Sequence, residues 1–137
     1  MRMSQKLEYA FRALAQLARC YDGHTLTRLE ELAQREAVSP NFLVQILADL
    51  RRAGIVESRR GHAGGYLLAQ APASTSFAQV IEAIDPSLLQ PNLSNAGASG
   101  PQLGRLWKGI SANLHAELAA TTLDDLIAQA DEAMFYI

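Results

Sequence analysis

Apolar residues recur at helical spacing along most of this chain, and the pattern is sharpest between residues 39 and 53. At 3.6 residues per turn, the apolar positions of this stretch share one side of a helix, which must pack on something. The Ser39 hydroxyl suits an N-cap, and Pro40 suits the first helical position because its missing N–H would have no partner there. The opposite side is slim and polar to basic, with Asp49 at its edge. The apolar positions are Phe42, Leu43, Ile46, Leu47, Leu50 and Ala53.

A hairpin is predicted directly after this helix, which Gly54 ends. Residues 55–60 and 66–68 have the composition of strands, and residues 61–65 between them are mostly glycine. A thin helix fits the major groove of DNA, and a short hairpin with arginines at its base can lie along the backbone beside it. The pattern therefore predicts a winged helix-turn-helix.

The flanking segments supply the other helices that a winged domain requires. Residues 4–21 predict a first helix, and residues after Ser76 predict a short helix that ends at Asp85. A second helix is expected to begin after Thr27, with Glu30 completing a capping box. A short strand around residues 25–26 is expected to pair with the wing. The resulting order is helix, helix, turn, helix, hairpin.

Periodicity is lost over residues 86–101 and returns after them. The stretch holds three prolines, two glycines, two asparagines and three serines, which predicts a mobile loop. From about residue 102 a narrow apolar seam follows a helix of roughly 18 residues, and Thr122 with Asp125 begins a last helix. The seam needs a partner, either the chain's own winged domain or the same helix of a second copy. We favour the homodimer. The seam residues are Leu103, Leu106, Trp107, Ile110 and Leu114.

The expected fold is thus mainly α with a small β-hairpin. Residues 1–85 form a winged helix-turn-helix DNA-binding domain, residues 86–101 a flexible loop, and residues 102–137 a helical region with a long dimerisation helix.

Composition excludes several further classes of protein. No apolar run is long enough to cross a bilayer, and charged residues interrupt the N-terminal apolar stretch, so we expect neither a membrane protein nor a secretory signal. A single cysteine, Cys20, excludes an intrachain disulfide and an all-cysteine metal site, which favours the cytoplasm. Residues 1–70 carry ten Lys and Arg against seven Asp and Glu, whereas residues 71–137 carry two against seven. This asymmetry fits a DNA reader with a separate pairing arm, although acidic helices are also simply common.

The exposed side of the central helix provides candidate base readers. Asn41 and Gln45 carry amides that can make paired contacts to adenine, and Val44 and Ala48 are small enough to touch a thymine methyl group. The alternative is ordinary helix surface.

Basic residues and glycines complete the predicted surface. The four arginines after residue 50 are expected to clamp phosphates, and one wing arginine to enter the minor groove with a histidine beside it. Solvated charge is the alternative. The wing glycines allow positive φ and a close approach to the backbone, which a plain hairpin turn also explains. The predicted DNA-binding residues are Ser39, Pro40, Asn41, Val44, Gln45, Arg51, Arg52, Arg59, Arg60, His62, Gly64 and Gly65, with Gly61 beside them.

The sequence gives little support for a metal site, a cofactor or catalysis. His24, His62 and His115 fall on different elements, so we predict no metal site and no cofactor. No nucleophile–base set or carboxylate pair suggests a catalyst, and an enzyme is not expected. Cys20 is either a redox switch or, as we favour, a small buried thiol.

Several motifs together resemble the Rrf2 family of bacterial transcription regulators, which includes iron–sulfur, nitric-oxide and cysteine-metabolism regulators. They are R-M-S-x-K, Y-A-x-R-A-L, S-P-x-F-L-x-Q-I-L-x-x-L-R-x-A-G-I-V, R-G-x-x-G-G-Y-x-L and L-W…T-T-L-x-D-L, and they cover nearly the whole chain. The resemblance implies a homodimeric repressor that binds a pseudo-palindromic operator. Much of the family senses through a cluster held by three cysteines before the long helix.

The chain departs from the family's pattern in that segment. Residues 86–101 contain no cysteine, and Pro101 and Gly104 stand where ligands are expected. One acidic residue, Glu8, cannot hold a cluster. In the DNA-binding part, His62-Ala63 and Val44 replace more usual residues, which changes the expected operator. We therefore expect a cluster-less DNA-binding regulator. The alternatives are a ligand- or metal-responsive sensor whose pocket lies beside residues 86–101, with a small-molecule effector, and a protein-binding adaptor that has lost DNA binding.

Overall fold

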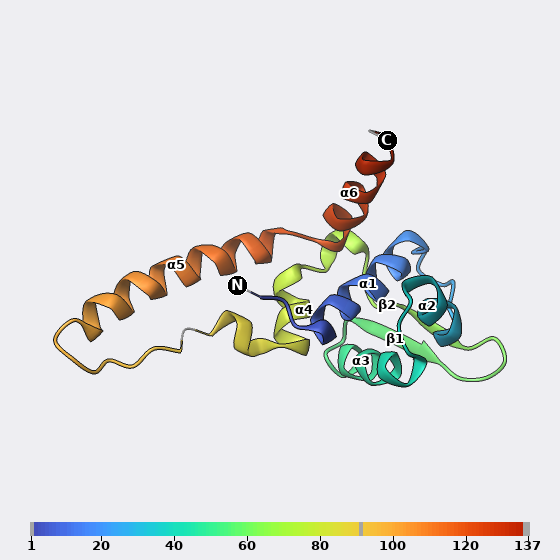
Figure 1. Ribbon diagram of the computed structural model, residues 1–137. Helices are drawn as coiled ribbons and strands as arrows, with labels where there is room; N and C mark the ends of the chain where they lie inside the picture. The colour runs from blue at the N-terminus through green and yellow to red at the C-terminus, as the bar shows by residue number, and fades with distance from the viewer. Residues whose placement is uncertain (1, 91, 136–137) are drawn as a thin grey trace.

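The computed structural model describes residues 2–90 and 92–135, with side chains described up to Gln129. This described part of the chain is mainly helical and contains one two-stranded hairpin, as predicted (Figure 1). The elements are α1 (Gln5–Arg19), α2 (Leu29–Glu36), α3 (Pro40–Arg52), β1 (Val56–Arg59), β2 (Gly65–Leu68), the 3₁₀ helix η1 (Pro72–Ser74), α4 (Phe77–Ile84), the 3₁₀ helix η2 (Pro86–Leu89), α5 (Gly100–Ala120) and α6 (Leu123–Phe135).

Helix α1 is the centre of the core. It packs against α2, α3, α4 and α6, and its apolar side is buried along its whole length. Leu14 of α1, Leu47 of α3 and Val80 of α4 have no exposed surface. Burying a side chain of this size stabilises the fold by roughly 1.5–3 kcal/mol. This shared core fixes the orientation of α3.

The hairpin is antiparallel, with Val56 opposite Leu68 and Arg59 opposite Gly65. Its second strand is also tied to the segment before α2. The Thr27 N–H donates to the Tyr66 carbonyl over 2.9 Å, and the Tyr66 N–H donates to the Thr27 carbonyl over 2.8 Å. The strand expected around residues 25–26 is therefore a single bridge at Thr27. It joins the second strand of the wing to the segment before α2.

One predicted N-cap is wrong, and a second is in place without its hydrogen bond. Thr27 is buried in the bridge to β2, so α2 begins one residue later, at the N-cap Arg28, without a side-chain cap. Ser39 does occupy the N-cap position of α3, with Pro40 at its start, but its hydroxyl accepts no cap hydrogen bond. The caps at Ser4 and Ser76 are present, and Ser76 forms a full capping box with Gln79.

Side chains of α1 hold the turn between α2 and α3 in place. Ala37 adopts a left-handed conformation with φ 54°, and the Val38 N–H donates to the Ala33 carbonyl over 3.0 Å. The Arg12 side chain donates to both the carboxylate and the carbonyl of Glu36, and Gln16 donates to the same carboxylate. These contacts fix where α3 begins relative to α1.

The C-terminal part differs from expectation in its boundaries. The segment predicted as a loop begins with η2, which packs on α4, and α5 begins at Gly100 and is 21 residues long. Helix α5 has no buried residue and extends away from the winged part of the chain (Figure 1). Helix α6 then returns to α1, with Leu123 fully buried, and Thr122 and Asp125 cap it reciprocally as predicted. No helix in the described ranges has the length and apolar character needed to span a bilayer.

Candidate DNA-binding surface

One side of α3 is buried and the other is open to solvent. Leu43, Ile46, Leu47 and Leu50 have no exposed surface, because they pack on the neighbouring helices. On the opposite side Val44 is 40% exposed. In Figure 1, α3 lies at the lower edge of the molecule, whereas α6 lies at the top and α5 extends to the left. The remaining predicted residues of the exposed side are Ser39, Pro40, Asn41 and Gln45, all exposed, and Ala48, which is half-buried.

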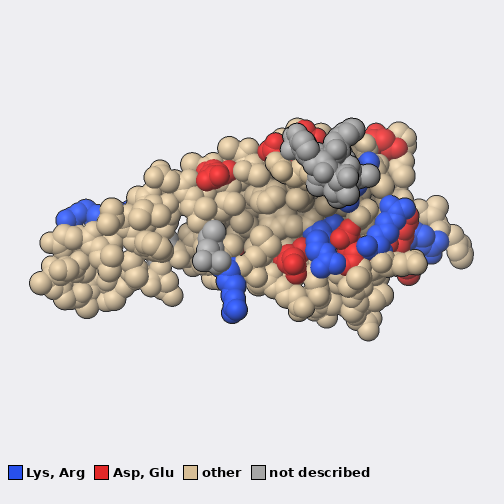
Figure 2. All heavy atoms as spheres, turned by 45° about the horizontal axis from the view of Figure 1, so that its top comes forward, with Lys and Arg blue, Asp and Glu red and all other residues tan. Residues whose placement is uncertain are grey.

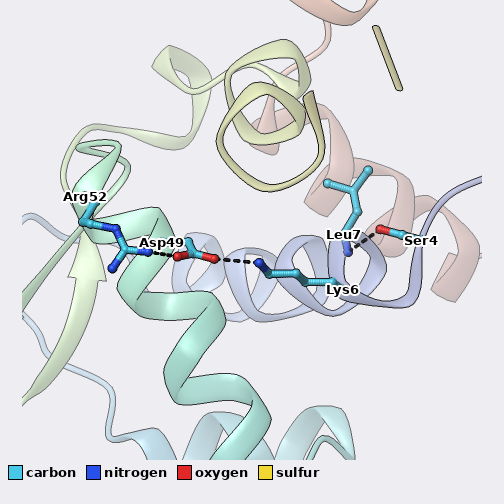
Figure 3. Close-up of polar contacts among 5 residues, drawn as sticks. All are labelled: Ser4, Lys6, Leu7, Asp49 and Arg52. Atoms are coloured by element: carbon cyan, nitrogen blue, oxygen red, sulfur yellow. Dashed lines mark hydrogen bonds and ion pairs between the residues drawn. The ribbon is translucent and has the colours of Figure 1, made fainter. Parts of the chain in front are cut away.

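The C-terminal end of α3 differs from the prediction in one detail. Ala53, expected on the packed side, is exposed because the helix ends at Arg52. Arg51 reaches toward β1, where its guanidinium donates to the Ser58 hydroxyl over 3.3 Å. Arg52 instead donates to Asp49, whose other oxygen lies 2.7 Å from Lys6 Nζ (Figure 3). The two neighbouring arginines of α3 thus have different partners.

The wing carries exposed charge where β1 meets the turn, and not at the base of the hairpin as predicted, because Arg59 pairs with Gly65 at the last position of the ladder. The Arg59 guanidinium lies 3.7 Å from the Glu57 carboxylate, and Arg60 and His62 are exposed. A shallow hollow of about 300 Å³ opens between the wing, the end of α3 and the start of α2. The arginines lining it are Arg28, Arg51, Arg59 and Arg60.

The wing glycines serve two different purposes. Gly61 has φ 104°, so it provides the left-handed turn residue. Gly64 and Gly65 do not have positive φ, contrary to expectation. Glycine is required at these two positions because any side chain would collide with the neighbouring backbone. A Cβ on Gly64 would lie 2.4 Å from the Arg59 carbonyl oxygen, and one on Gly65 would lie 2.6 Å from that of Thr27. Both glycines therefore lie close to a backbone, as the sequence predicts, and in this structure it is the backbone of the protein itself.

Sequence reasoning missed two basic residues at this surface. The Arg28 guanidinium donates to the His62 carbonyl over 3.1 Å and so links the start of α2 to the wing. Lys6 of α1 reaches Asp49 of α3. Neither had a sequence signal, because each contact joins segments that only the tertiary fold brings together.

The other polar groups of the described residues serve structural purposes or face solvent. Among the described residues, no three His, Cys, Asp or Glu side chains converge as metal ligands would. Asp22 stabilises a turn: hydrogen bonds from the Thr25 hydroxyl and the backbone N–H groups of Thr25 and His24 hold the pKa of its carboxyl well below the ordinary value. Cys20, expected to be buried, is partly exposed at the end of α1.

Helix α5 presents an uncovered apolar seam. Leu103 is 54% exposed, Leu106 66%, Trp107 44% and Ile110 50%. In Figure 2 the arm formed by α5 carries few charged side chains, whereas Lys, Arg, Asp and Glu alternate over the winged part. The fifth predicted seam residue, Leu114, is half-buried. It lines an apolar cavity of about 350 Å³ between η2 and α5, together with Leu88, Leu89, Gln90, Trp107, Ile110 and Ser111.

Comparison with known proteins identifies the family. Residues 3–129 match the model of the Rrf2 family, described as iron-dependent transcriptional regulators. The chain is 38% identical to the transcriptional regulator IscR of Cereibacter sphaeroides over 136 residues, which cover 93% of this chain and 87% of that protein. It is 32% identical to the regulator CymR of Bacillus subtilis over the full length of both.

Solved structures agree with these matches. The structure of B. subtilis CymR, a global cysteine regulator, superposes with a TM-score of 0.81 at 28% identity, covering 94% of this chain and 98% of that one. IscR of T. potens superposes with a TM-score of 0.77 at 30% identity, covering 97% and 90%. These relatives are transcriptional regulators and not enzymes, and they share the winged helix-turn-helix fold. This chain belongs to the Rrf2 family of DNA-binding transcriptional regulators.

Proposed function

We propose that this protein is a homodimeric transcriptional repressor that binds a pseudo-palindromic operator. One observation carries the proposal: the side of α3 opposite the core is open and free of acidic groups, and the wing arginines lie beside its C-terminal end. A helix presented in this way enters the major groove, and the wing follows the adjacent backbone.

Each part of the surface has its own role in this proposal. Asn41 and Gln45 read adenine edges, and Val44 contacts a thymine methyl group, because these side chains are exposed on the groove side of α3. Arg51, Arg59 and Arg60 bind phosphates around the hollow beside the wing. Arg28 joins them, since it lines the same hollow.

The seam of α5 supports dimerisation. Four large apolar side chains on one helix are about half exposed or more, and leaving such a stripe in water is unfavourable. A second copy of the same helix covers it with matching apolar side chains, and two-fold symmetry then presents two α3 helices to two half-sites. Such a regulator acts in the cytoplasm, where the bacterial chromosome lies.

The donor atoms of this chain do not fit an iron–sulfur cluster. Such clusters are held by several thiolates, and this chain has one cysteine, Cys20, at the end of α1. The segment between η2 and α5 has none. The proposed repressor therefore works without a cluster.

Selection of bound fragments from the genome of the source organism tests the proposal. We expect a small set of fragments that share an inverted repeat, and affinity that falls steeply with salt because phosphate neutralisation releases counterions. Binding without any sequence preference would contradict the operator. Absence of salt-dependent DNA binding would favour the protein-binding adaptor instead.

The apolar cavity between η2 and α5 favours a second candidate, a ligand-responsive regulator. Its lining is mostly aliphatic with one tryptophan, which suits an apolar small-molecule effector. Native mass spectrometry and elemental analysis of the purified protein test this candidate. An empty dimer that keeps full operator affinity would count against it.

A further inference from the structure

Asp49 is the only carboxylate on α3, and it holds two cations at the edge of the proposed DNA-binding side (Figure 3). Lys6 Nζ lies 2.7 Å from Asp49 Oδ2, and Arg52 donates to Asp49 Oδ1. The Asp49 side chain is 21% exposed, whereas those of Lys6 and Arg52 are 40% and 69% exposed. Both cations are therefore more exposed than the carboxylate that holds them, and without it they would be free to bind a phosphate.

Local helix electrostatics favour Arg52 in the last turn of α3 but do not account for Lys6 or Asp49. Lys6 lies in the first turn of α1, where the positive end of the helix dipole disfavours a cation. Asp49 lies in the last turn of α3, where the negative end disfavours an anion. An ion pair this exposed also stabilises the folded chain only slightly. The arrangement therefore needs a reason other than helix stability.

The position of Asp49 supplies that reason. On a helix, residues three and four apart are neighbours, so Asp49 lies beside both Gln45 and Arg52. Sequence-independent affinity for DNA rises with the number of phosphates that Lys and Arg side chains neutralise. A carboxylate that binds two cations at this edge therefore lowers the number of phosphates that the surface can neutralise. It leaves the exposed amides of Asn41 and Gln45 free to read bases.

We propose that Asp49 is a positioning residue that limits nonspecific DNA affinity by keeping Lys6 and Arg52 away from phosphates. The inference rests on the proposed DNA-binding function, and it adds a residue that lowers the affinity for nonspecific DNA. Phosphate binding is then carried by the arginines around the wing, and Arg52 contributes less than its neighbour Arg51.

The test compares Asp49→Asn with the wild type in the full-length chain. Fluorescence anisotropy gives the affinity for a random-sequence duplex between about 50 and about 200 mM salt. Releasing the cations is expected to steepen the plot of log affinity against log salt by about 0.9 for each cation that gains a phosphate, and to tighten binding about tenfold at the lowest salt. Asp124→Asn is the matched control, because it makes the same chemical change on an exposed side chain of α6. It should change neither quantity.

A slope for Asp49→Asn equal to that of Asp124→Asn, or weaker binding, would overturn this inference alone. A wild type that shows no salt-dependent binding would overturn the proposed function as well. Lys6→Gln gives a second test that does not depend on the folding of the Asp49 variant. If Asp49 keeps Lys6 from phosphates, Lys6→Gln leaves the slope unchanged; a decrease of about 0.9 per protomer contradicts the inference.

Discussion

At the scale of single residues, exposed amides and exposed guanidiniums on one surface should contribute to binding in different ways. Gln45→Ala is expected to relax the base preference of one operator position, because a paired amide–adenine contact contributes about 1–3 kcal/mol of discrimination. Arg60→Ala is expected to weaken binding to operator and random DNA about equally and to reduce the salt slope by about 0.9 per protomer. Competition binding with single-base operator variants measures both effects. A double Asn41→Ala, Gln45→Ala protein that still selects the wild-type operator would show that the readers are elsewhere.

The residue scale is also where sequence reasoning succeeded and failed most clearly. The exposure of Asn41, Val44 and Gln45 followed from helical periodicity, which needs no knowledge of the tertiary fold. Thr27 resembled an N-cap, but its backbone pairs with Tyr66, a residue far along the chain. Arg28 gained its place beside the wing through that same pairing. Local patterns therefore located the groove side of α3 but missed contacts made between distant segments.

At the scale of elements, two serine N-caps provide a matched pair. Ser76 accepts from the Gln79 N–H and caps α4 fully, whereas the Ser39 hydroxyl makes no cap bond on α3. Ser76→Ala is expected to lower the free energy of unfolding by about 1 kcal/mol, and Ser39→Ala to leave it nearly unchanged. Because the Ser39 hydroxyl remains free to donate to a phosphate, Ser39→Ala should instead weaken DNA binding. Urea denaturation and anisotropy separate the two effects. An equal loss of stability in both variants would mean that Ser39 does cap α3 in solution.

The elements themselves were largely predictable. The positions of α1, α3, α4 and the hairpin follow from apolar spacing, caps and glycines. The segment after Asp85 was the least predictable. Its proline-rich composition indicates a loop, yet it begins with a 3₁₀ helix that packs on α4. The start of α5 was placed too late for a related reason. Gly100 and Pro101 indicate a loop by composition, yet proline is well suited to the first turn of a helix.

At the scale of the whole molecule, function depends on whether two copies pair through α5. Leu106→Glu is expected to produce a monomer in sedimentation experiments, because it places a charge in the apolar seam. Leu106 is 66% exposed and α5 has no buried residue, so the helical content of the protomer should be retained in far-UV circular dichroism. Ala112→Glu is the matched control, since at 100° per residue it lies on the opposite side of α5 from Ile110 and its side chain is exposed. A protomer that has lost its partner holds one half-site at a time, so operator affinity should fall by at least about a hundredfold in Leu106→Glu only. A Leu106→Glu protein that remains dimeric, or an Ala112→Glu protein that dissociates equally, would show that the copies pair through another surface.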